Sequence, residues 1–247
     1  MSLETYDESF FDYNDRISAS SARRIVPVVQ SLVPTIESVA DFGCARGVWL
    51  RVWSECGAQS ICGLDGDYVD RSCLQIPADD FVTHDLSQPI DLGRHFDIVQ
   101  SLEVAEHLPQ SAAAGFVESL TRHGKIVLFS AAAPGQGGAH HLNEQPYGYW
   151  RDLFAERQFR LFDCVRPQIV NDTDLQTWYR FNSFLYVHGD NIAELSDLVR
   201  TTEIPRNSPV PDVSPFSYRL RKAVVKRLPD SIQNGLATVA SKLRGYR

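Results

Sequence analysis

The stretch VADFGCARG, residues 39–47, decides the fold. It joins a short apolar run, Ser38–Phe42, to a segment with helical spacing of apolar residues, Gly47–Cys56. Glycine is needed where a strand turns sharply into a helix and where a ligand comes close to the backbone. A strand, a glycine turn and a helix in this order predict an open α/β sheet with a ligand site at the strand's carboxyl end.

The rest of the chain continues this alternation. Two helices are predicted at Ala112–Leu120 and Tyr149–Glu156. Further strands are predicted at Ser60–Leu64, Phe81–His84, Phe96–Ser101, Lys125–Ser130, Phe159–Val165 and Phe181–Val187. Apolar runs separated by helices indicate a mostly parallel sheet with helices on both faces. The last two strands lack a long intervening helix, which predicts an antiparallel, hairpin-like end.

Composition and charge narrow the function classes. The 247 residues are 43% hydrophobic, enough for one good-sized core. The net charge of -7 argues against a general nucleic-acid binder. Residues 216–247 hold eight basic residues and one acidic residue, whereas the rest holds 16 basic and 30 acidic residues. An acidic body therefore carries a basic tail.

Cysteine usage and the first residues indicate a compartment. The five cysteines are an odd number without C-x-x-C spacing, which disfavours a disulfide framework or a zinc ribbon. Residues 1–15 are acidic and lack the apolar core of a signal peptide. No apolar run is long enough to cross a bilayer. We therefore expect a cytoplasmic protein.

The glycine loop has the spacing D-x-G-x-x-x-G. Ala45 stands where a dinucleotide fingerprint would have its middle glycine, which disfavours a nicotinamide-dependent oxidoreductase. Asp41 precedes the loop, and a carboxylate there suits a cationic ligand better than a pyrophosphate.

Residues 39–47 closely resemble motif I of class I S-adenosylmethionine-dependent methyltransferases. The resemblance covers roughly residues 10 to 190 and implies a Rossmann-like seven-stranded sheet, mostly parallel, with an antiparallel last strand. In that family the glycine loop wraps the methionine part of the cofactor, and the acids after the second and third strands hold ribose and adenine. It implies these cofactor-binding residues: Asp41, Phe42, Gly43, Cys44, Gly47, Trp49, Asp65, Gly66, Asp85, Leu86, Ser101, Leu102 and Glu103.

The segment 103–107 has the pattern E-x-x-E-H. If it is helical, its acids and histidine share a face. The pattern resembles a divalent-ion site of ubiquinone-biosynthesis O-methyltransferases and small-RNA 2′-O-methyltransferases, so Mg²⁺ is a candidate cofactor. The candidate ligands are Glu103, Glu106, His107 and His141. In the alternative, Glu106 and His107 make packing hydrogen bonds and Glu103 faces the cofactor.

A loop rich in small and polar residues, 131–147, follows the fifth strand. Its GQGG-x-x-H-x-NEQ pattern resembles bacterial methyltransferase-domain proteins associated with surface polysaccharides or glycans. The catalytic candidates are His141, Glu144 and His107, since a histidine is a suitable general base for a hydroxyl. The aromatics Tyr147, Tyr149 and Trp150 are candidates for stacking on a sugar. In the alternative, His141 and Glu144 only tie down the loop.

Weaker signals flank this centre. Tyr179, Arg180 and Asn182 line the substrate cleft or belong to an edge-strand surface, while Tyr13 and Asn14 are candidates for a lid. We expect a helical lid in residues 1–35, a methyltransferase domain in 36–190, and a linker and basic helical tail in 191–247.

The tail has two parts. Ile204–Pro215 contains four prolines and is predicted to be a linker. Phe216–Leu228 places apolar residues four apart among basic ones, so it either lies on an anionic membrane or packs its stripe on the body or another subunit. Ser231–Leu243 is a candidate second helix.

The main functional hypothesis is methyl transfer to a hydroxyl of a saccharide-like or other small-molecule acceptor. Methyl transfer to nitrogen or to another small metabolite is the second hypothesis, and it would depend little on His141. A non-catalytic cofactor-binding partner protein is the third, and it would bind the cofactor without turnover.

Overall fold

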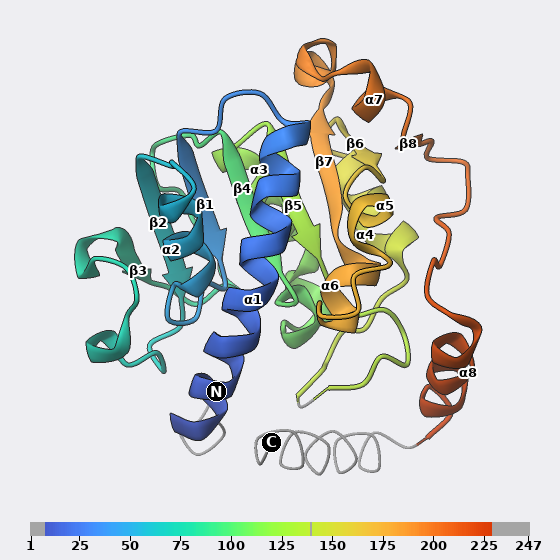
Figure 1. Cartoon of the computed structure of the whole chain (residues 1–247), viewed down its shortest axis with the longest axis horizontal. Helices are drawn as coiled ribbons and strands as arrows, with labels where there is room; N and C mark the ends of the chain where they lie inside the picture. Colours follow the sequence, from blue (N-terminus) through green and yellow to red (C-terminus); the bar gives the residue numbers. More distant parts are fainter. Residues whose placement is uncertain (1–7, 139, 229–247) are drawn as a thin grey trace.

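The computed structural model describes residues 8–138 and 140–228, and the strands in this part form one sheet in the order β3-β2-β1-β4-β5-β7-β6-β8 (Figure 1). The strands are β1 (Ser38–Phe42), β2 (Ser60–Asp65), β3 (Phe81–Thr83), β4 (Ile98–Leu102), β5 (Ile126–Ser130), β6 (Phe159–Phe162), β7 (Phe184–His188) and β8 (Glu203–Ile204). The helices are α1 (Glu8–Leu32), α2 (Val48–Glu55), α3 (Ala113–His123), α4 (Tyr147–Ala155), α5 (Arg166–Ile169), α6 (Thr177–Asn182), α7 (Asp197–Arg200) and α8 (Phe216–Val225).

The sheet has the predicted topology. Strands β1 to β5 pair in parallel, and β7 pairs antiparallel with both β5 and β6. The chain runs outward from β1 to β3 and then returns to β4 beside β1, so the strand order reverses between β1 and β4. Ligands of open α/β sheets bind at such a reversal. The two-residue strand β8 is an eighth strand that we did not predict, because it is short and lies at the start of the proline-rich segment.

The connection before β7 differs from the expected hairpin. Helices α5 and α6 lie between β6 and β7, so these strands are antiparallel neighbours joined by a long crossing segment. Residues 177–182 form α6, which corrects the alternative that they belong to an edge-strand surface. This helix places Asn182 directly before β7, at the edge of the sheet where β4 and β5 end.

Helices cover both faces of the sheet (Figure 1). Ala22, Val26 and Val29 of α1 pack with Leu50 and Trp53 of α2 in the core on one face. Helices α3 and α4 supply the core of the other face, with side chains such as Phe116, Leu120, Trp150 and Phe154. Since both faces are covered there, the central strands β1, β2, β4 and β5 are buried along nearly their whole length rather than alternating between buried and exposed residues.

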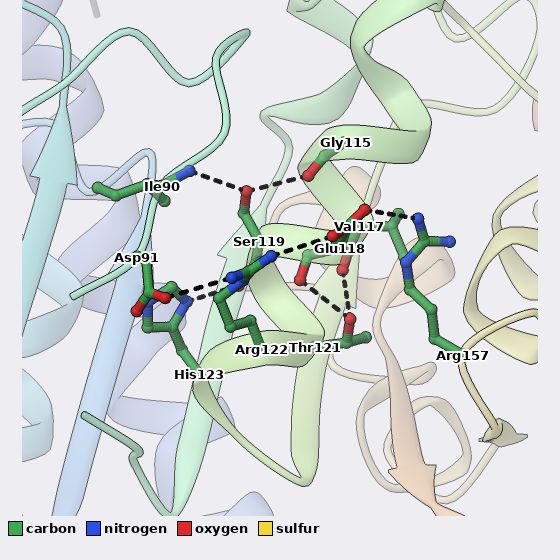
Figure 2. Close-up of polar contacts among 10 residues, drawn as sticks. All are labelled: Ile90, Asp91, Gly115, Val117, Glu118, Ser119, Thr121, Arg122, His123 and Arg157. Atoms are coloured by element: carbon green, nitrogen blue, oxygen red, sulfur yellow. Dashed lines mark hydrogen bonds and ion pairs between the residues drawn. The ribbon is translucent and has the colours of Figure 1, made fainter. Parts of the chain in front are cut away.

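Polar contacts fix α3 against the segment that leads into β4 (Figure 2). The amide of Leu92 donates to His123 Nε2 at 2.8 Å, and His123 Nδ1 donates to the Ser119 carbonyl at 2.6 Å. Arg122 bridges Asp91 and Glu118, as Figure 2 shows. Burial lowers the pKa of His123. The neutral imidazole therefore completes the backbone hydrogen bonding of this loop.

The proline-rich segment after β8 lies against the domain rather than free of it. Arg151 donates to the Ser208 carbonyl at 2.5 Å, and the fully buried Arg166 donates to the Pro211 carbonyl at 3.0 Å. Within residues 8–138 and 140–228, no helix is both long and apolar enough to span a membrane.

Helix α8 contradicts one of the alternatives left open by the sequence, that its apolar stripe packs on the body. Phe216, Leu220 and Val224 are exposed, while Lys222 is buried and bonded to Asp212 at 2.6 Å. The stripe prediction also included Leu228, which lies beyond the end of α8. The predicted second tail helix, residues 231–243, lies outside the described residues.

Candidate functional site

The candidate site lies along the carboxyl edge of the parallel strands. The glycine loop follows β1, Asp65 ends β2, Glu103 follows β4, and the 131–146 loop follows β5. Asn182 reaches the same edge because β7 runs antiparallel. The predicted residues of the glycine loop and of the reacting end are therefore brought to one side of the sheet.

The glycine loop needs its glycines for space and for conformation. Gly43 has φ +94°, and a Cβ there would lie 2.3 Å from a methyl group of Val104. Gly47 has φ +82°, and a Cβ there would meet Ile76 at 2.8 Å. Positive φ is strained for residues with a side chain. The loop thus lies tightly between the segment that follows β2 and the segment that follows β4.

Asp41 is a buried carboxyl at the end of β1. It lies opposite Gln100 in the β1–β4 register. Burial raises the pKa of Asp41 to about 8, Gln100 opposes the shift, and the charge of Asp65 adds to it. A cation bound beside Asp41 would restore its ionised form, because an opposite charge nearby stabilises a carboxylate. This carboxyl therefore fits the methionine amino group of the cofactor.

Asp65 is a buried acceptor shared by three donors of the chain. The amides of Ala45 and Gly66 each donate to it at 2.7 Å, and the Tyr68 hydroxyl donates as well. Burial raises the pKa of Asp65, while these hydrogen bonds oppose the rise. Since both oxygens already accept hydrogen bonds, a ribose diol bound here would have to compete with the Tyr68 hydroxyl. The sequence offered no signal for this use of Tyr68.

The N-terminal end of α1 is tied to the cofactor side of the site. Asp15 accepts from Gln75 at 2.7 Å and forms an ion pair with Arg46 of the glycine loop at 3.3 Å. The Arg46 side chain is 8% exposed, so this pair is partly shielded from water. Tyr13 and Asn14 fall within the first turns of α1.

The other predicted cofactor residues divide between core and loop. Phe42 packs its side chain against Phe116 and His123, so only its backbone borders the loop. Ser101 donates to the Phe42 carbonyl at 2.8 Å and thereby joins the ends of β1 and β4. Trp49 is buried beside Tyr179, with their ring centroids 5.2 Å apart.

The remaining predicted cofactor-binding residues differ in how far their side chains are exposed. Cys44, Leu86 and Leu102 are buried. Asp85 is exposed and accepts from the amide and hydroxyl of Ser87, which lowers its pKa.

Glu103 is the centre of a polar cluster rather than part of a helix. It has φ +57° and precedes a short 3-10 turn, Ala105–His107, so the expected shared helical face of residues 103–107 is wrong. Its carboxylate accepts from Gln136 at 2.7 Å and from Asn182 at 3.0 Å. The Tyr147 hydroxyl donates to Asn182 at 2.8 Å and completes the cluster.

Burial raises the pKa of Glu103, and the hydrogen bonds from Asn182, Gln136 and Ser130 oppose the rise. A left-handed conformation at a non-glycine residue is uncommon and is frequent at functional sites. Asn182, a candidate for the substrate cleft, contacts Glu103, and its role toward a substrate stays a prediction. Gln136 was missed, because a glutamine in a glycine-rich loop has no distinctive spacing.

Glu106, His107 and His141 form a second group, with one ligand atom of each within 4.8 Å of the others. In the described part of the chain, neither carboxylate oxygen of Glu106 nor Nδ1 of His107 has a hydrogen-bond partner, although all three atoms are buried. Burial raises the pKa of Glu106 well above its usual range, even though the amides of Glu106 and Ala132 face it. Burial and the nearby His141 lower the pKa of His107 to about 3.

His141 and Glu144 form a hydrogen-bonded pair. His141 Nδ1 lies 2.7 Å from Glu144 Oε1, and the amides of Gly135 and Gly137 also donate to Glu144. Burial raises the pKa of Glu144, but the hydrogen bond and charge of His141 and the two amides lower it overall. The pair therefore both closes the loop, as the structural alternative predicted, and leaves His141 Nε2 for other contacts. A Cβ at Gly138 would lie 2.0 Å from that nitrogen.

The aromatic residues after this loop are less available than expected. Tyr147 and Trp150 are buried, with Trp150 packed on Phe129 at 5.3 Å between ring centroids. The prediction that Tyr147 and Trp150 stack on a sugar face is therefore wrong. Tyr149 is partly exposed and stays a candidate. Arg180 is buried and donates to the Asp172 carbonyl at 2.9 Å, which directs it away from a substrate role.

The sequence matches a family model described as a methyltransferase domain over residues 11–178. This match covers well over half of the chain, and the chain belongs to that family. It is a class I methyltransferase that depends on S-adenosylmethionine, as the glycine loop and the acids after the strands predicted. No significant sequence match to a curated protein was found.

Solved structures with a similar fold include these three chains. DesVI of Streptomyces venezuelae is 16% identical with a TM-score of 0.53, covering 74% of this chain and 100% of its own. The sugar N-methyltransferase KedS8 of Streptoalloteichus is 16% identical with a TM-score of 0.52, covering 69% and 87%. The magnesium protoporphyrin IX methyltransferase of Synechocystis, with bound S-adenosylhomocysteine, is 18% identical with a TM-score of 0.51, covering 74% and 86%. At these identities the likeness concerns the fold alone.

Proposed function

We propose that this enzyme transfers the methyl group of S-adenosylmethionine to a hydroxyl of a saccharide-like acceptor, with His141 as general base. The observation that carries the proposal is the 2.7 Å contact between His141 Nδ1 and Glu144. A carboxylate on Nδ1 holds the imidazole in one tautomer, so that Nε2 is the nitrogen that accepts a proton.

The proposed reaction is an in-line displacement. His141 Nε2 accepts the hydroxyl proton while the acceptor oxygen bonds to the methyl carbon and the bond between that carbon and sulfur breaks. Asp41 and Asp65 hold the cofactor through its cationic and ribose ends, which fixes the position of the methyl group. Positioning of the two reactants supplies much of the rate.

The polar side chains at this edge support a polyol acceptor. Glu103, Gln136 and Asn182 offer both hydrogen-bond donors and acceptors, and they hold one another in place. The partly exposed Tyr149 lies at the start of α4 beside this loop. Because KedS8, a protein of similar fold, is a sugar N-methyltransferase, amino sugars are also acceptors to test.

The test is a screen of saccharides and amino sugars with labelled S-adenosylmethionine, using wild type and His141→Asn. For a hydroxyl acceptor, the variant should lose activity by about 10²- to 10⁴-fold, the usual contribution of a general base. His140→Asn is the matched control, because His140 is an exposed neighbour in the same loop. Methyl transfer to an amine that survives in His141→Asn would support the nitrogen acceptor, and cofactor binding without turnover would support the non-catalytic alternative.

A specific observation also favours a divalent metal at the second group. Glu106 and His107 present buried atoms without hydrogen-bond partners in the described part of the chain, and His141 lies beside them. As an alternative to His141 as general base, we propose that Glu106, His107 and Nε2 of His141 hold a divalent metal ion. The ion would then polarise the acceptor hydroxyl in place of the base, because a metal-bound Nε2 cannot also accept a proton. The donor set has two imidazoles and one carboxylate, whereas Mg²⁺ and Mn²⁺ prefer oxygen ligands, so the set suits Zn²⁺ better.

This metal set replaces the one predicted from the E-x-x-E-H pattern. Glu103 is engaged by Gln136 and Asn182 and is not part of the group. Calorimetric titration with Zn²⁺, Mn²⁺ and Mg²⁺ tests the assignment. Glu106→Gln should abolish binding, and Glu103→Gln should retain it. Failure of all three ions to bind wild-type protein would refute the metal alternative and leave His141 as the general base.

We propose, further, that the start of α1, within the predicted lid of residues 1–35, closes over the cofactor; residues 1–7 lie outside the described residues, and the later part of α1 packs in the core. The Asp15 contacts with Arg46 and Gln75 support this, because they attach the start of α1 to the glycine loop and to the segment before β3. Asp15→Asn should speed release of S-adenosylhomocysteine in stopped-flow experiments. An unchanged release rate would refute the lid.

A further inference from the structure

The outward face of α8 is apolar. Phe216, Leu220 and Val224 have 72%, 55% and 53% of their surface exposed, and they are three of the five large hydrophobic residues that stand out as exposed in the described part of the chain. Residues four apart lie on one face of a helix. The helix therefore presents a continuous apolar row to the outside, which is costly in water unless another surface covers it.

The orientation of α8 is fixed by its inner face. Lys222 is buried and pairs with Asp212 at 2.6 Å, and Arg221 donates to the Gln136 carbonyl at 3.0 Å. The backbone of Lys222 is so close to Gly135 that a Cβ there would clash at 2.1 Å. Because these contacts hold the polar side inward, the helix cannot turn its apolar row toward the domain without breaking them.

Positive charge surrounds the apolar row. The exposed residues Arg219, Arg221, Lys226 and Arg227 lie in or just after α8, and residues 216–228 contain no acid. A groove of about 410 Å³ lies between α8 and the start of α4, and its lining includes Arg219, Lys222 and Lys226. Asp212 also lines the groove but is paired with Lys222. The net charge around the groove is therefore positive.

We propose that α8 binds the surface of an anionic phospholipid bilayer, with the apolar row inserted among the lipids and headgroup phosphates in the basic groove. An apolar row flanked by cations and free of acids is the pattern of an interfacial helix. Charge complementarity favours phosphates over an ordinary protein partner, which would carry both signs of charge. The proposal goes beyond methyl transfer and does not depend on the acceptor.

Helix α8 lies at the end of the molecule that carries the candidate site (Figure 1), where Arg221 contacts the loop after β5. Bilayer binding would therefore bring the carboxyl edge of the sheet close to the lipid surface. If the proposed function holds, membrane-bound acceptors would be presented there.

The experiment is co-sedimentation of the full chain with vesicles of phosphatidylcholine alone or with 30 mol% phosphatidylserine, a composition chosen to give roughly the surface charge of an anionic leaflet. The wild type should bind the anionic vesicles and release at high salt. The triple variant Phe216→Ser, Leu220→Ser, Val224→Ser and the double variant Arg219→Gln, Lys226→Gln should each bind at least about tenfold more weakly. Leu198→Ser removes an equally exposed apolar residue, 62% exposed, from α7 and should bind like wild type.

Binding of S-adenosylhomocysteine by every variant verifies that the domain is folded and keeps this test separate from that of the catalytic proposal. Wild-type protein that does not bind anionic vesicles, or a triple variant that binds like wild type, overturns the proposal. A row that instead mediates self-association would appear as a dimer in light scattering that the triple variant abolishes, without vesicle binding, and this result also overturns it.

Discussion

Replacing Asp41 by asparagine should stabilise the unliganded protein while weakening cofactor binding. The Asp41 carboxyl is buried, and its pKa is raised to about 8 in the folded chain. The unfolded chain loses this proton near the ordinary carboxyl pKa of about 4. Between these values the folded state binds the extra proton, so stability contributed by this group falls as pH rises. Asparagine has the same shape and no such proton.

The magnitude follows from proton linkage. A single carboxyl changes the free energy of unfolding by at most about 1.4 kcal/mol per pH unit within this window. Allowing for relaxation around the buried charge, we expect the advantage of Asp41→Asn to grow by about 2–4 kcal/mol between pH 5 and pH 8. For a chain of this size, each kcal/mol corresponds to about 2–4 °C in Tm.

Urea unfolding at pH 5, 6.5 and 8, followed by tryptophan fluorescence, measures this advantage. Asp67→Asn is the matched control, because Asp67 is an exposed carboxyl just after β2. Calorimetry in parallel should show that Asp41→Asn binds S-adenosylhomocysteine at least about tenfold more weakly, since it loses a charge-assisted contact. A stability difference that stays constant across pH, or equals that of Asp67→Asn, would refute the assignment of a buried protonated carboxyl.

Three further substitutions test other parts of the structure. Tyr68→Phe should raise the affinity for S-adenosylhomocysteine by about two- to tenfold, because the ribose no longer competes with the phenol for Asp65; unchanged or weaker binding in calorimetry would contradict that competition. His123→Ala should lower the free energy of unfolding in urea by about 1–3 kcal/mol, because it leaves a loop amide without an acceptor; a loss below 0.5 kcal/mol, an estimate of the noise between surface variants, would contradict it. Gly43→Ala should destabilise the protein more than Gly57→Ala, since both glycines have positive φ but only the first Cβ would clash; equal losses in thermal unfolding would show that conformation alone matters.

The parallel part of the sheet was predictable because its signals are local. The run Ser38–Phe42 coincides with β1, and the strands after it differ from β2 to β5 by a few residues at their ends. Strands β1, β2, β4 and β5 are buried along nearly their whole length and each adjoins an α-helix in the chain, so composition alone marks them. The short edge strand β3 is only partly buried. The cofactor loop was predictable for the same reason, because its glycines are required by the backbone.

The reacting end was less predictable because it is built from contacts distant in sequence. Glu103 was identified, but its partners Gln136 and Asn182 come from a loop and from a short helix. The E-x-x-E-H spacing suggested a helical face, whereas the left-handed conformation of Glu103 directs its side chain elsewhere. Periodicity reports amphipathic faces of regular elements, and it says nothing about loops or about which side of α8 packs inward.

Gln136 connects the candidate site with the tail. Its side chain holds Glu103, and its carbonyl accepts from Arg221 of α8. Linkage between two binding events is reciprocal. If a ligand that alters the Glu103 contacts strengthens the contact of α8 with the loop, then that contact must strengthen ligand binding by the same factor. In this chain, Gln136 is the loop residue through which such a linkage between the site and the C-terminal helix would run.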